Sequence, residues 1–408
     1  MNLVIDARTV RPGRSGVGNY TESLVRALGG TRPVRALVLD PAAFGPVPPA
    51  GVELIPVATD YQRHPAGEWW ENVTLPRLLA RLGADVFWGP AFLIPWVPVR
   101  ARAVATIHDL TAFTHPGCYP PRFAAYMRFA IRMAASRADG LVCVSHHVAG
   151  EVARLFPAAA GRIRMVHSAA DADFTPSRPP LPGSPSPSPS PVPSPVHPRP
   201  YILAVGARDP RKNTALLLEA YARLRAAWPG SAGVDLVLTG GWDGPAAPGV
   251  IALPRVPRET LIELYRQAAV FALPSLGEGF GLPVLEAMAC GCPVVSSHAP
   301  ALPEVAGDAA LYFDPADADS LAAALRRVLE DPAKAAAMRG AGLARAAGFG
   351  WDKAAAEMWD FFEELASRPG GPPHLSRGRK PPGTWQNPAR AEGPPHDPTE
   401  FDAGKTRS

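Results

Sequence analysis

The stretch at 270–297 constrains the fold of this chain more than any other. Residues 270–273 are apolar and read as a buried strand, and the loop that follows them contains Gly279 and Gly281. Pro283 then fits the first turn of a helix, where a missing backbone N–H breaks no hydrogen bond. Strand, glycine-rich loop and helix in this order are typical of an α/β sheet with parallel strands.

The helix predicted over 283–290 begins at a place suited to an anion. The first N–H groups of a helix have no partner inside it and carry partial positive charge. The backbone of Gly279, Phe280, Gly281 and Leu282 is therefore expected to bind phosphate, and glycine should keep the approach free of side chains.

Two carboxylates, Glu278 and Glu286, bracket this anion site with seven residues between them. Each could simply solvate or cap a helix end. A carboxylate beside an anion site is more useful for accepting hydrogen bonds from hydroxyl groups. A sugar–diphosphate–nucleoside carries sugar hydroxyls, phosphates and ribose hydroxyls in that order.

The segment EGFGLPVLEAMACGCPVV, which starts at Glu278, resembles the E-x7-E signature of the retaining family 4 glycosyltransferases. This resemblance implies the GT-B fold, in which two Rossmann-like, doubly wound α/β domains face a cleft. It also implies that Glu286 holds the donor ribose and that Glu278 holds the hydroxyls of the donor sugar.

A basic turn at 205–213 follows the first predicted strand of the second half and opens a helix. Its Arg208, Arg211 and Lys212 suit a diphosphate, although a solvated turn with a helix cap at Asn213 is an equal alternative. The turn resembles the V-G-x-x-x-P-R-K-N segment of the same family. That resemblance implies that Lys212 and one of the two arginines bind the donor diphosphate.

The first half contributes Gly16 and Gly18 before a helix, and His108 and Asp109 just after a strand at 103–107. Taken alone, the glycines indicate a flexible turn, and a histidine at a strand end is more often structural. Ligands nevertheless bind beyond the carboxyl ends of strands in open α/β sheets. The family resemblance implies that this glycine loop faces the cleft and that His108 reaches the donor sugar.

Two other functions compete with that of a glycosyltransferase. Asp40, at the end of the second strand, favours an NAD(P)-dependent oxidoreductase, but a dinucleotide fingerprint needs glycine where this chain has Thr21. A non-catalytic nucleotide-sugar-binding protein is the second alternative. Metal ligation by His108, Asp109 and His115 is disfavoured, and no metal is expected.

Strand and helix patterns alternate along the chain, which predicts two doubly wound α/β units. Strands are predicted at 2–6, 34–40, 52–57, 85–88, 103–107, 140–144, 163–167, 201–206, 234–239, 250–253, 270–273, 293–296 and 310–313. Helices are predicted at 17–28, 69–82, 121–136, 147–155, 213–227, 258–267, 283–290, 317–330, 333–347 and 351–366.

The expected domain organisation follows from these patterns and from composition. Residues 1–174 form an N-terminal Rossmann-like domain on the acceptor side, and 175–200 form a linker rich in Ser-Pro repeats. Residues 201–350 form the nucleotide-sugar domain. The helix at 351–366 crosses back to the first domain in the family, and 367–408 are expected to be a disordered tail.

Charge and cysteine content bear on location and partners. Four cysteines in apolar contexts favour a reducing cytoplasm, and no apolar run is long enough to span a bilayer. Residues 1–175 carry 18 arginines against 13 acids. This excess is either an ordinary solvated surface or a contact with anionic lipid at the inner face of the membrane.

Together these features predict a cytoplasmic, retaining, metal-independent hexosyltransferase with mannose-like or glucose-like specificity. The donor would be a GDP- or UDP-hexose, and no cofactor beyond this donor is expected. The acceptor would be a glycan or a lipid-linked molecule, and nucleic acid is not expected as a partner.

Overall fold

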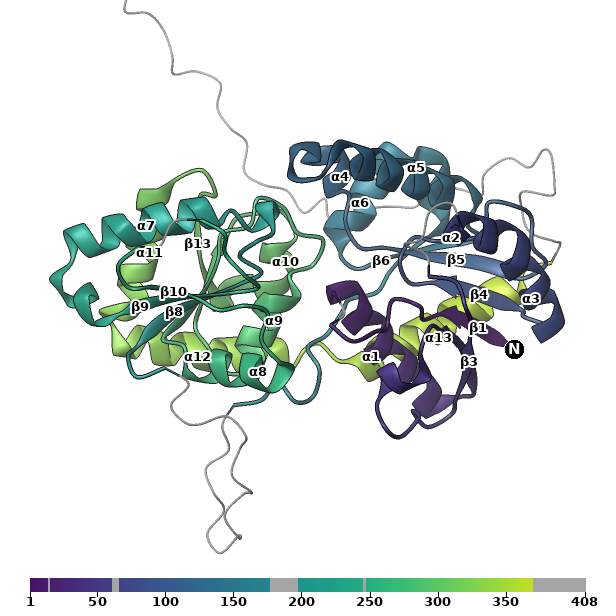
Figure 1. Ribbon diagram of the computed structural model, residues 1–408, viewed down its shortest axis with the longest axis horizontal. Coiled ribbons are helices and arrows are strands. Elements are labelled where there is room, and N and C mark those ends of the chain that lie inside the picture. Colours follow the sequence, from purple (N-terminus) through teal and green to yellow (C-terminus); the bar gives the residue numbers. More distant parts are fainter. Residues whose placement is uncertain (14, 61–65, 177–196, 245–246, 370–408) are drawn as a thin grey trace, which may run out of the picture. The chain divides into compact units, whose positions relative to one another are not determined.

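The structure is a computed structural model that describes residues 1–13, 15–60, 66–176, 197–244 and 247–369 (Figure 1). Most of the predicted linker at 175–200 and of the predicted tail at 367–408 lies outside these residues. Among the helices of the described part, none is both long enough and apolar enough to cross a membrane.

The first half of the chain forms a sheet of seven parallel strands in the order β3-β2-β1-β4-β5-β6-β7. The strands are β1 (Leu3–Asp6), β2 (Val34–Val38), β3 (Val52–Pro56), β4 (Val86–Gly89), β5 (Arg102–Ile107), β6 (Gly140–Cys143) and β7 (Ile163–Met165). The chain runs outward from β1 to β3 and then returns to the other side of β1. This is the doubly wound order, which opens a crevice at the carboxyl ends of β1 and β4.

The second half forms a sheet of six parallel strands with the equivalent order β10-β9-β8-β11-β12-β13. Its strands are β8 (Tyr201–Val205), β9 (Asp235–Thr239), β10 (Val250–Ala252), β11 (Val270–Leu273), β12 (Val294–Ser297) and β13 (Ala310–Phe313). The expectation of two doubly wound α/β units is therefore confirmed, and the crevice of this sheet lies after β8 and β11.

Helices cover both faces of the second sheet (Figure 1). Residues that alternate along a strand point to opposite faces. Leu203 and Phe271 accordingly pack with the helices on one face, and Ile202 and Val270 pack with those on the other. Helices α8 (Arg258–Gln267) and α9 (Leu282–Ala289) line the first face, and α7 (Thr214–Ala227) and α11 (Ala318–Leu329) line the second.

The remaining helices lie within a few residues of their predicted bounds, with three exceptions. These remaining helices are α1 (Gly16–Thr31), α2 (Ala66–Trp69), α3 (Leu75–Leu82), α4 (Thr111–Thr114), α5 (Pro121–Arg137), α6 (His146–Leu155), α10 (Leu302–Ala306), α12 (Pro332–Ala346) and α13 (Trp351–Ser367). The short helices α4 and α10 were not predicted, because one turn carries too little periodicity to be recognised.

The third exception is the helix predicted at 69–82, which the structure contains but with a π-helical turn that was not predicted. The structure has α2, then a π-helical turn at Trp70–Thr74, then α3. Pro76 explains the π-helical turn, since it has no N–H and its ring clashes with the carbonyl four residues earlier in a regular α-helix. The N–H of Leu75 bonds instead to the carbonyl of Trp70, five residues back.

Helix α13 packs on the first sheet, although it comes last among the described elements. Its Met358 and Phe362 belong to the same hydrophobic core as β1 and β4. Phe362 contacts Trp88 with ring centroids 6.0 Å apart. The indole N–H of Trp359 donates to Thr31 Oγ1 over 2.8 Å. The core of the first sheet is therefore completed by a segment that follows the second sheet in sequence.

Candidate functional site

The glycine-rich loop between β11 and α9 lies where it was predicted, and packing explains its glycines. Gly281 is the N-cap of α9 and has φ of 100°, a left-handed conformation that favours glycine. A Cβ on Gly281 would lie 2.4 Å from Leu302 Cδ2. The missing side chain at this position therefore avoids a clash with α10, which is a different reason from the open approach for phosphate that we expected.

Gly279 lies against the end of β5. A Cβ on Gly279 would lie 1.6 Å from the carbonyl oxygen of His108 and 3.0 Å from Asp109 Cβ. The hydroxyl of Ser145, which is also the N-cap of α6, donates to the Gly279 carbonyl over 2.6 Å. The loop of the second half thus meets the carboxyl ends of β5 and β6, and it brings together Gly279 and His108, both predicted site residues.

Glu278 and Lys212 form an ion pair in this region. Lys212 Nζ lies 2.6 Å from Glu278 Oε1, and both side chains are largely buried. The hydroxyl of Ser275 donates to the same carboxylate oxygen over 2.6 Å. The glutamate therefore holds the lysine ammonium at the start of the glycine-rich loop, and the lysine compensates the charge of the glutamate.

The two arginines of the basic turn have different surroundings. Arg211 pairs with Asp209 over 2.7 Å and with Asp109 of the first half over 3.3 Å. Burial alone would lower the pKa of Arg211, but the bonds to Asp209 and the charge of Asp109 raise it above its usual value. Arg208 is 68% exposed and pairs with Asp243 over 2.7 Å. Arg211 is therefore the one that joins the two halves.

Asn213, the last residue of the basic turn, caps the next helix through its backbone. Asn213 is the N-cap of α7, but its side chain makes no capping bond to the helix. Its amide donates to the carbonyl of Pro315 over 3.0 Å. Asn213 thus occupies the predicted cap position and uses its side chain to hold the segment between β13 and α11.

Glu286 faces Tyr265 of α8. The phenol of Tyr265 donates to Glu286 Oε2 over 3.1 Å. Burial raises the pKa of Glu286 to about 7, although the Tyr265 bond and the charges of Arg258 and Lys212 lower it. The carboxyl group is therefore balanced between its protonated and ionised forms near neutral pH.

His108 is held as a neutral imidazole. Its Nε2 lies 2.7 Å from the carbonyl oxygen of Pro90, which can only accept, so Nε2 carries the proton. Burial lowers the pKa of His108 below its usual value. The ring of Tyr20 meets the imidazole edge-on, with centroids 4.7 Å apart. Nδ1 of His108 is consequently an acceptor.

The predicted Gly16 and Gly18 lie in the first turn of α1. Gly16 is exposed, and a Cβ on it would meet no atom within 4 Å, whereas Gly18 is buried. Tyr20, one turn further on, connects α1 to His108 and also contacts Trp351 of α13 with ring centroids 5.7 Å apart. The contribution of Tyr20 was missed, since nothing in its local sequence distinguishes it from an ordinary core aromatic.

A small cavity of about 80 Å³ adjoins the ion pair. Both halves of the chain line it, with Glu278 from the glycine-rich loop and Asp109, Thr111 and His115 from the segment after β5. Asp109 accepts hydrogen bonds from the backbone and hydroxyl of Thr111. Three of the residues that the sequence analysis named line this cavity, Glu278, Asp109 and His115.

A larger cavity of about 540 Å³ is lined by residues of α1, α8 and α13. Asp171, which also lines it, lies 2.7 Å from the guanidinium of Arg258 and 2.6 Å from the indole nitrogen of Trp351. The charges of Asp171 and Arg258 both act on Glu286. Sequence reasoning missed these residues, because their three segments lie far apart in the chain and form no motif.

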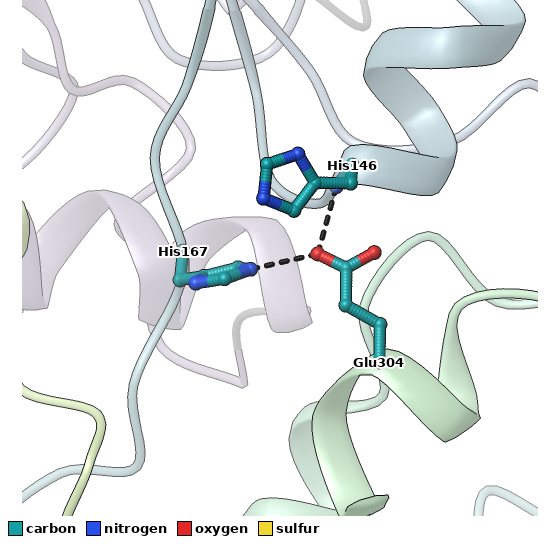
Figure 2. A group of neighbouring side chains, drawn as sticks. All are labelled: His146, His167 and Glu304. Atoms are coloured by element: carbon teal, nitrogen blue, oxygen red, sulfur yellow. Dashed lines mark hydrogen bonds and ion pairs between the residues drawn. The ribbon is translucent and has the colours of Figure 1, made fainter. Parts of the chain in front are cut away.

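Figure 2 shows a group of side chains from which a metal ion could draw ligands, His146, His167 and Glu304. Glu304 Oε1 accepts from the His146 backbone N–H and from His167 Nε2, each over 2.7 Å. Its Oε2 accepts from the His147 N–H over 3.1 Å. Burial would raise the pKa of Glu304, but the bonds from His167 and the two N–H groups lower it. Glu304 of α10 thus caps α6 of the other half.

Two family descriptions match the chain. Residues 14–174 match Glycosyltransferase Family 4, and residues 199–331 match Glycosyl transferases group 1. Among curated proteins, O-antigen chain mannosyltransferase B of Escherichia coli is 31% identical over 394 residues, which cover 90% of this chain and 100% of that protein.

Solved structures share the fold. Sucrose-phosphate synthase of Thermosynechococcus elongatus has a TM-score of 0.67 and 20% sequence identity, covering 90% of this chain and 99% of that one. HepE of Anabaena in complex with UDP-glucose has a TM-score of 0.63 and 17% identity, covering 90% of this chain and 100% of that one. Both sheets of the chain are thus found in one known architecture.

Proposed function

The chain belongs to the family 4 glycosyltransferases, and from this premise we propose that it transfers a mannosyl residue with retention of the anomeric configuration. The donor would be a nucleotide diphosphate sugar, and the acceptor would be a hydroxyl group of a glycan or of a lipid-linked molecule. We further propose that it works without a metal and without any cofactor besides the donor. Its place would be the cytoplasm, at the inner face of the membrane.

The observation that carries this proposal is the convergence of Glu278, Lys212 and Gly279 with His108 at the carboxyl ends of two parallel sheets. The pairs Lys212–Glu278 and Gly279–His108 each join residues predicted from separate motifs. An ammonium group, the start of a helix and a carboxyl group in one place match the phosphates and hydroxyls of a sugar nucleotide.

The diphosphate would bind at the first N–H groups of α9, beside Lys212. Phosphate oxygens are stronger partners for an ammonium group than a carboxylate that also accepts from Ser275. Lys212 would therefore turn to the diphosphate when the donor binds, which releases Glu278 to accept hydrogen bonds from the donor sugar. Glu286 would accept hydrogen bonds from the ribose.

The arginine that assists Lys212 would be Arg208. Arg211 remains tied to Asp209 and Asp109, so it is held in place at the junction of the two halves. Arg208 is exposed and pairs only at the surface with Asp243, so its side chain can swing toward the phosphates at little cost.

The transfer step would break the bond between the anomeric carbon and the phosphate oxygen and form a bond to the acceptor oxygen on the same face. The proton of the acceptor hydroxyl would pass to the departing phosphate oxygen. Lys212 and the start of α9 stabilise the charge that develops on the diphosphate. His108, as a neutral imidazole, would position the sugar through a hydrogen bond to Nδ1.

The names of the similar proteins suggest two candidate donors for this chain. The E. coli relative is named a mannosyltransferase, which favours a mannosyl donor and hence GDP-mannose. HepE was solved with UDP-glucose on the same fold at low identity. The basic turn at 205–213 resembles members that use GDP-mannose, and we propose GDP-mannose as the donor.

One observation bears on the oxidoreductase alternative. Asp40, which a dinucleotide enzyme would use for the cofactor ribose, accepts a hydrogen bond from the Ala42 N–H over 2.9 Å and caps a short 3-10 helix at Pro41–Phe44. The carboxylate is thus engaged in local structure. This supports the glycosyltransferase over the oxidoreductase.

The test is calorimetric titration of the full chain with GDP-mannose, UDP-glucose and NADPH, followed by an assay of donor hydrolysis and transfer in EDTA. We expect binding of GDP-mannose and release of GDP in EDTA. Binding without any turnover would support a nucleotide-sugar sensor instead. Loss of activity in EDTA that manganese restores would refute the metal-independent mechanism.

A further inference from the structure

Three potential metal ligands from different elements converge where α10 meets α6. They are His146 at the start of α6, His167 after β7 and Glu304 of α10, and their ligand atoms all lie within 4.8 Å of one another (Figure 2). Within the described residues, no other group of three or more His, Cys, Asp or Glu side chains comes this close. The two histidines belong to the first half of the chain, and the glutamate belongs to the second.

The carboxylate of Glu304 is oriented by groups that are not themselves ligands. Its Oε1 accepts from the His146 backbone N–H over 2.7 Å, and its Oε2 accepts from the His147 N–H over 3.1 Å. Arg345 donates to the carbonyls of Glu304 and Val305 over 2.6 and 2.8 Å, which fixes the backbone of α10. Carboxylates that bind metals are held in place by outer hydrogen bonds of this kind. A metal ion would therefore find this ligand already positioned.

The two imidazole rings lie on either side of the carboxylate. His167 Nε2 is 2.7 Å from Glu304 Oε1. The ring of His167 contacts Phe280 of the glycine-rich loop and Phe349, with centroids 5.9 and 5.4 Å apart, so it is packed in place. His146 is exposed, and its ring meets that of His167 edge-on with centroids 5.8 Å apart. The His146 side chain can therefore reach an ion from the solvent side.

The donor set selects the class of metal. Two imidazoles and one carboxylate suit zinc and related transition metals, whereas calcium and magnesium prefer oxygen ligands. Bonds from zinc to nitrogen and oxygen are about 2.0 to 2.1 Å, so the ligand atoms of a tetrahedral site lie about 3.3 Å apart. The present separations, from 2.7 Å to no more than 4.8 Å, reach that value through small side-chain rotations. A water molecule would complete the four ligands.

We propose that His146, His167 and Glu304 bind one zinc ion, which links the two halves of the chain. Zinc would take the place of the proton between His167 Nε2 and Glu304 Oε1, and the neutral imidazole would keep its proton on Nδ1. The backbone N–H bonds to Glu304 remain, so the metal adds to the contact between α10 and α6.

A metal bond between the halves bears on exchange of the donor, a consequence that rests on the proposed function. The cavity beside the Lys212–Glu278 pair is about 80 Å³, whereas pockets for drug-sized ligands measure about 300 to 1,000 Å³. The sugar and diphosphate of the donor therefore need the halves to move apart at this place. Zinc that links the halves would slow donor entry and product release. The ion would be a reversible inhibitor that takes no part in the transfer step.

The test is calorimetric titration of the full, EDTA-treated and dialysed chain with zinc chloride. We expect one zinc ion per chain and no binding of magnesium. His146→Ala should lower the zinc affinity more than about 100-fold, because loss of an outer partner alone costs about ten- to a hundred-fold. This variant should fold like the parent, since His146 is exposed. Glu304→Gln, which keeps the size of the side chain and one acceptor oxygen, should weaken zinc binding as well.

His298→Ala is the matched control, because His298 is an exposed histidine outside the group, and it should bind zinc like the parent. If the parent shows no saturable zinc binding, the inference is wrong. It is equally wrong if His146→Ala and Glu304→Gln both keep the parent affinity, since the ion would then bind elsewhere on the chain.

Donor hydrolysis on the same preparations separates this inference from the proposed function. Zinc should slow the release of GDP from GDP-mannose by the parent, EDTA should reverse the effect, and His146→Ala should be insensitive to zinc. In EDTA, parent and His146→Ala should have the same affinity for GDP-mannose. Zinc binding that leaves turnover unchanged would overturn the link between the halves. A chain that binds zinc as expected but neither binds nor turns over any donor in EDTA would refute the proposed function alone.

Discussion

The buried environment of Glu286 predicts how donor binding depends on pH. Its pKa is raised to about 7 by burial. Below that pH the group is protonated and accepts hydrogen bonds poorly, whereas above it the carboxylate accepts them strongly. Donor affinity should therefore rise as the pH increases from about 6 to about 8, and donor binding near neutral pH should release a proton.

This prediction is checked by calorimetry in buffers of different ionisation enthalpy across that range. Glu286→Gln, which cannot ionise, should bind the donor about ten- to a hundred-fold more weakly than the parent at the high end and lose the pH dependence. A parent whose affinity is flat across neutral pH would contradict the role given to Glu286.

The raised pKa of Glu286 also predicts an effect on stability. A carboxyl group with a folded pKa above its unfolded value contributes stability below that unfolded value, and this contribution is lost as the pH rises through about 7. Glu286→Gln should therefore raise the free energy of unfolding at pH 8 by up to about 3 kcal/mol and change it little near pH 5. Denaturant melts at the two pH values measure the difference. Equal changes in the free energy of unfolding at the two pH values would mean that burial does not raise the pKa of Glu286.

At the scale of elements, Gly279 tests how closely the glycine-rich loop approaches β5. Gly279→Ala would place Cβ against the His108 carbonyl, a backbone atom that cannot rotate away. We expect the free energy of unfolding to fall by about 1 to 3 kcal/mol, as for other overpacked positions. Gly16→Ala is the matched control, since a Cβ there meets no atom within 4 Å and alanine favours a helix. If the two variants have the same free energy of unfolding, the close approach of Gly279 to β5 does not limit the side chain at this position.

The elements themselves were largely predictable from the sequence, because parallel strands buried on both faces and helices of three or more turns leave strong patterns. The helix predicted at 69–82 is present, but its π-helical turn before Pro76 was not predicted, because a periodic pattern does not show where the hydrogen bonds must change partner. The motifs also located Glu278, Lys212 and Gly279. They could not locate Tyr20, Asp171 or Tyr265, because those side chains matter through contacts with segments remote in the chain, and such contacts leave no local signature.

At the scale of the whole molecule, the side chain of Glu304 links the two halves of the chain through hydrogen bonds. It caps α6 from α10 and also accepts from His167 (Figure 2). Because its pKa is lowered in the folded protein, this contact should persist above the unfolded value of 4.5 and be lost as the pH falls below it. The two halves are thus tied together by a charged group throughout the neutral range.

Removing this group should be visible by amide exchange. Glu304→Ala leaves the His146 and His147 N–H groups without their acceptor, so their exchange should accelerate about ten- to a hundred-fold, as expected for the loss of hydrogen bonds to a charged group. Glu330→Ala, which affects only a pair at the end of α11 (Arg326 Nε to Glu330 Oε1, 2.9 Å), is the control and should exchange like the parent at α6. Unchanged protection in Glu304→Ala would show that the cap is dispensable.

The packing of α13 on the first sheet has a consequence for how the protein is made. While the ribosome adds the second sheet, residues 1–176 have already emerged, yet the apolar surface that later receives Met358 and Phe362 is still uncovered. The nascent first half should therefore depend on chaperones until α13 leaves the exit tunnel. Expressed alone, residues 1–176 should aggregate, and co-expression of a 351–369 peptide should recover soluble protein. A fragment 1–176 that melts cooperatively by itself would show that the early half matures without waiting for the end of translation.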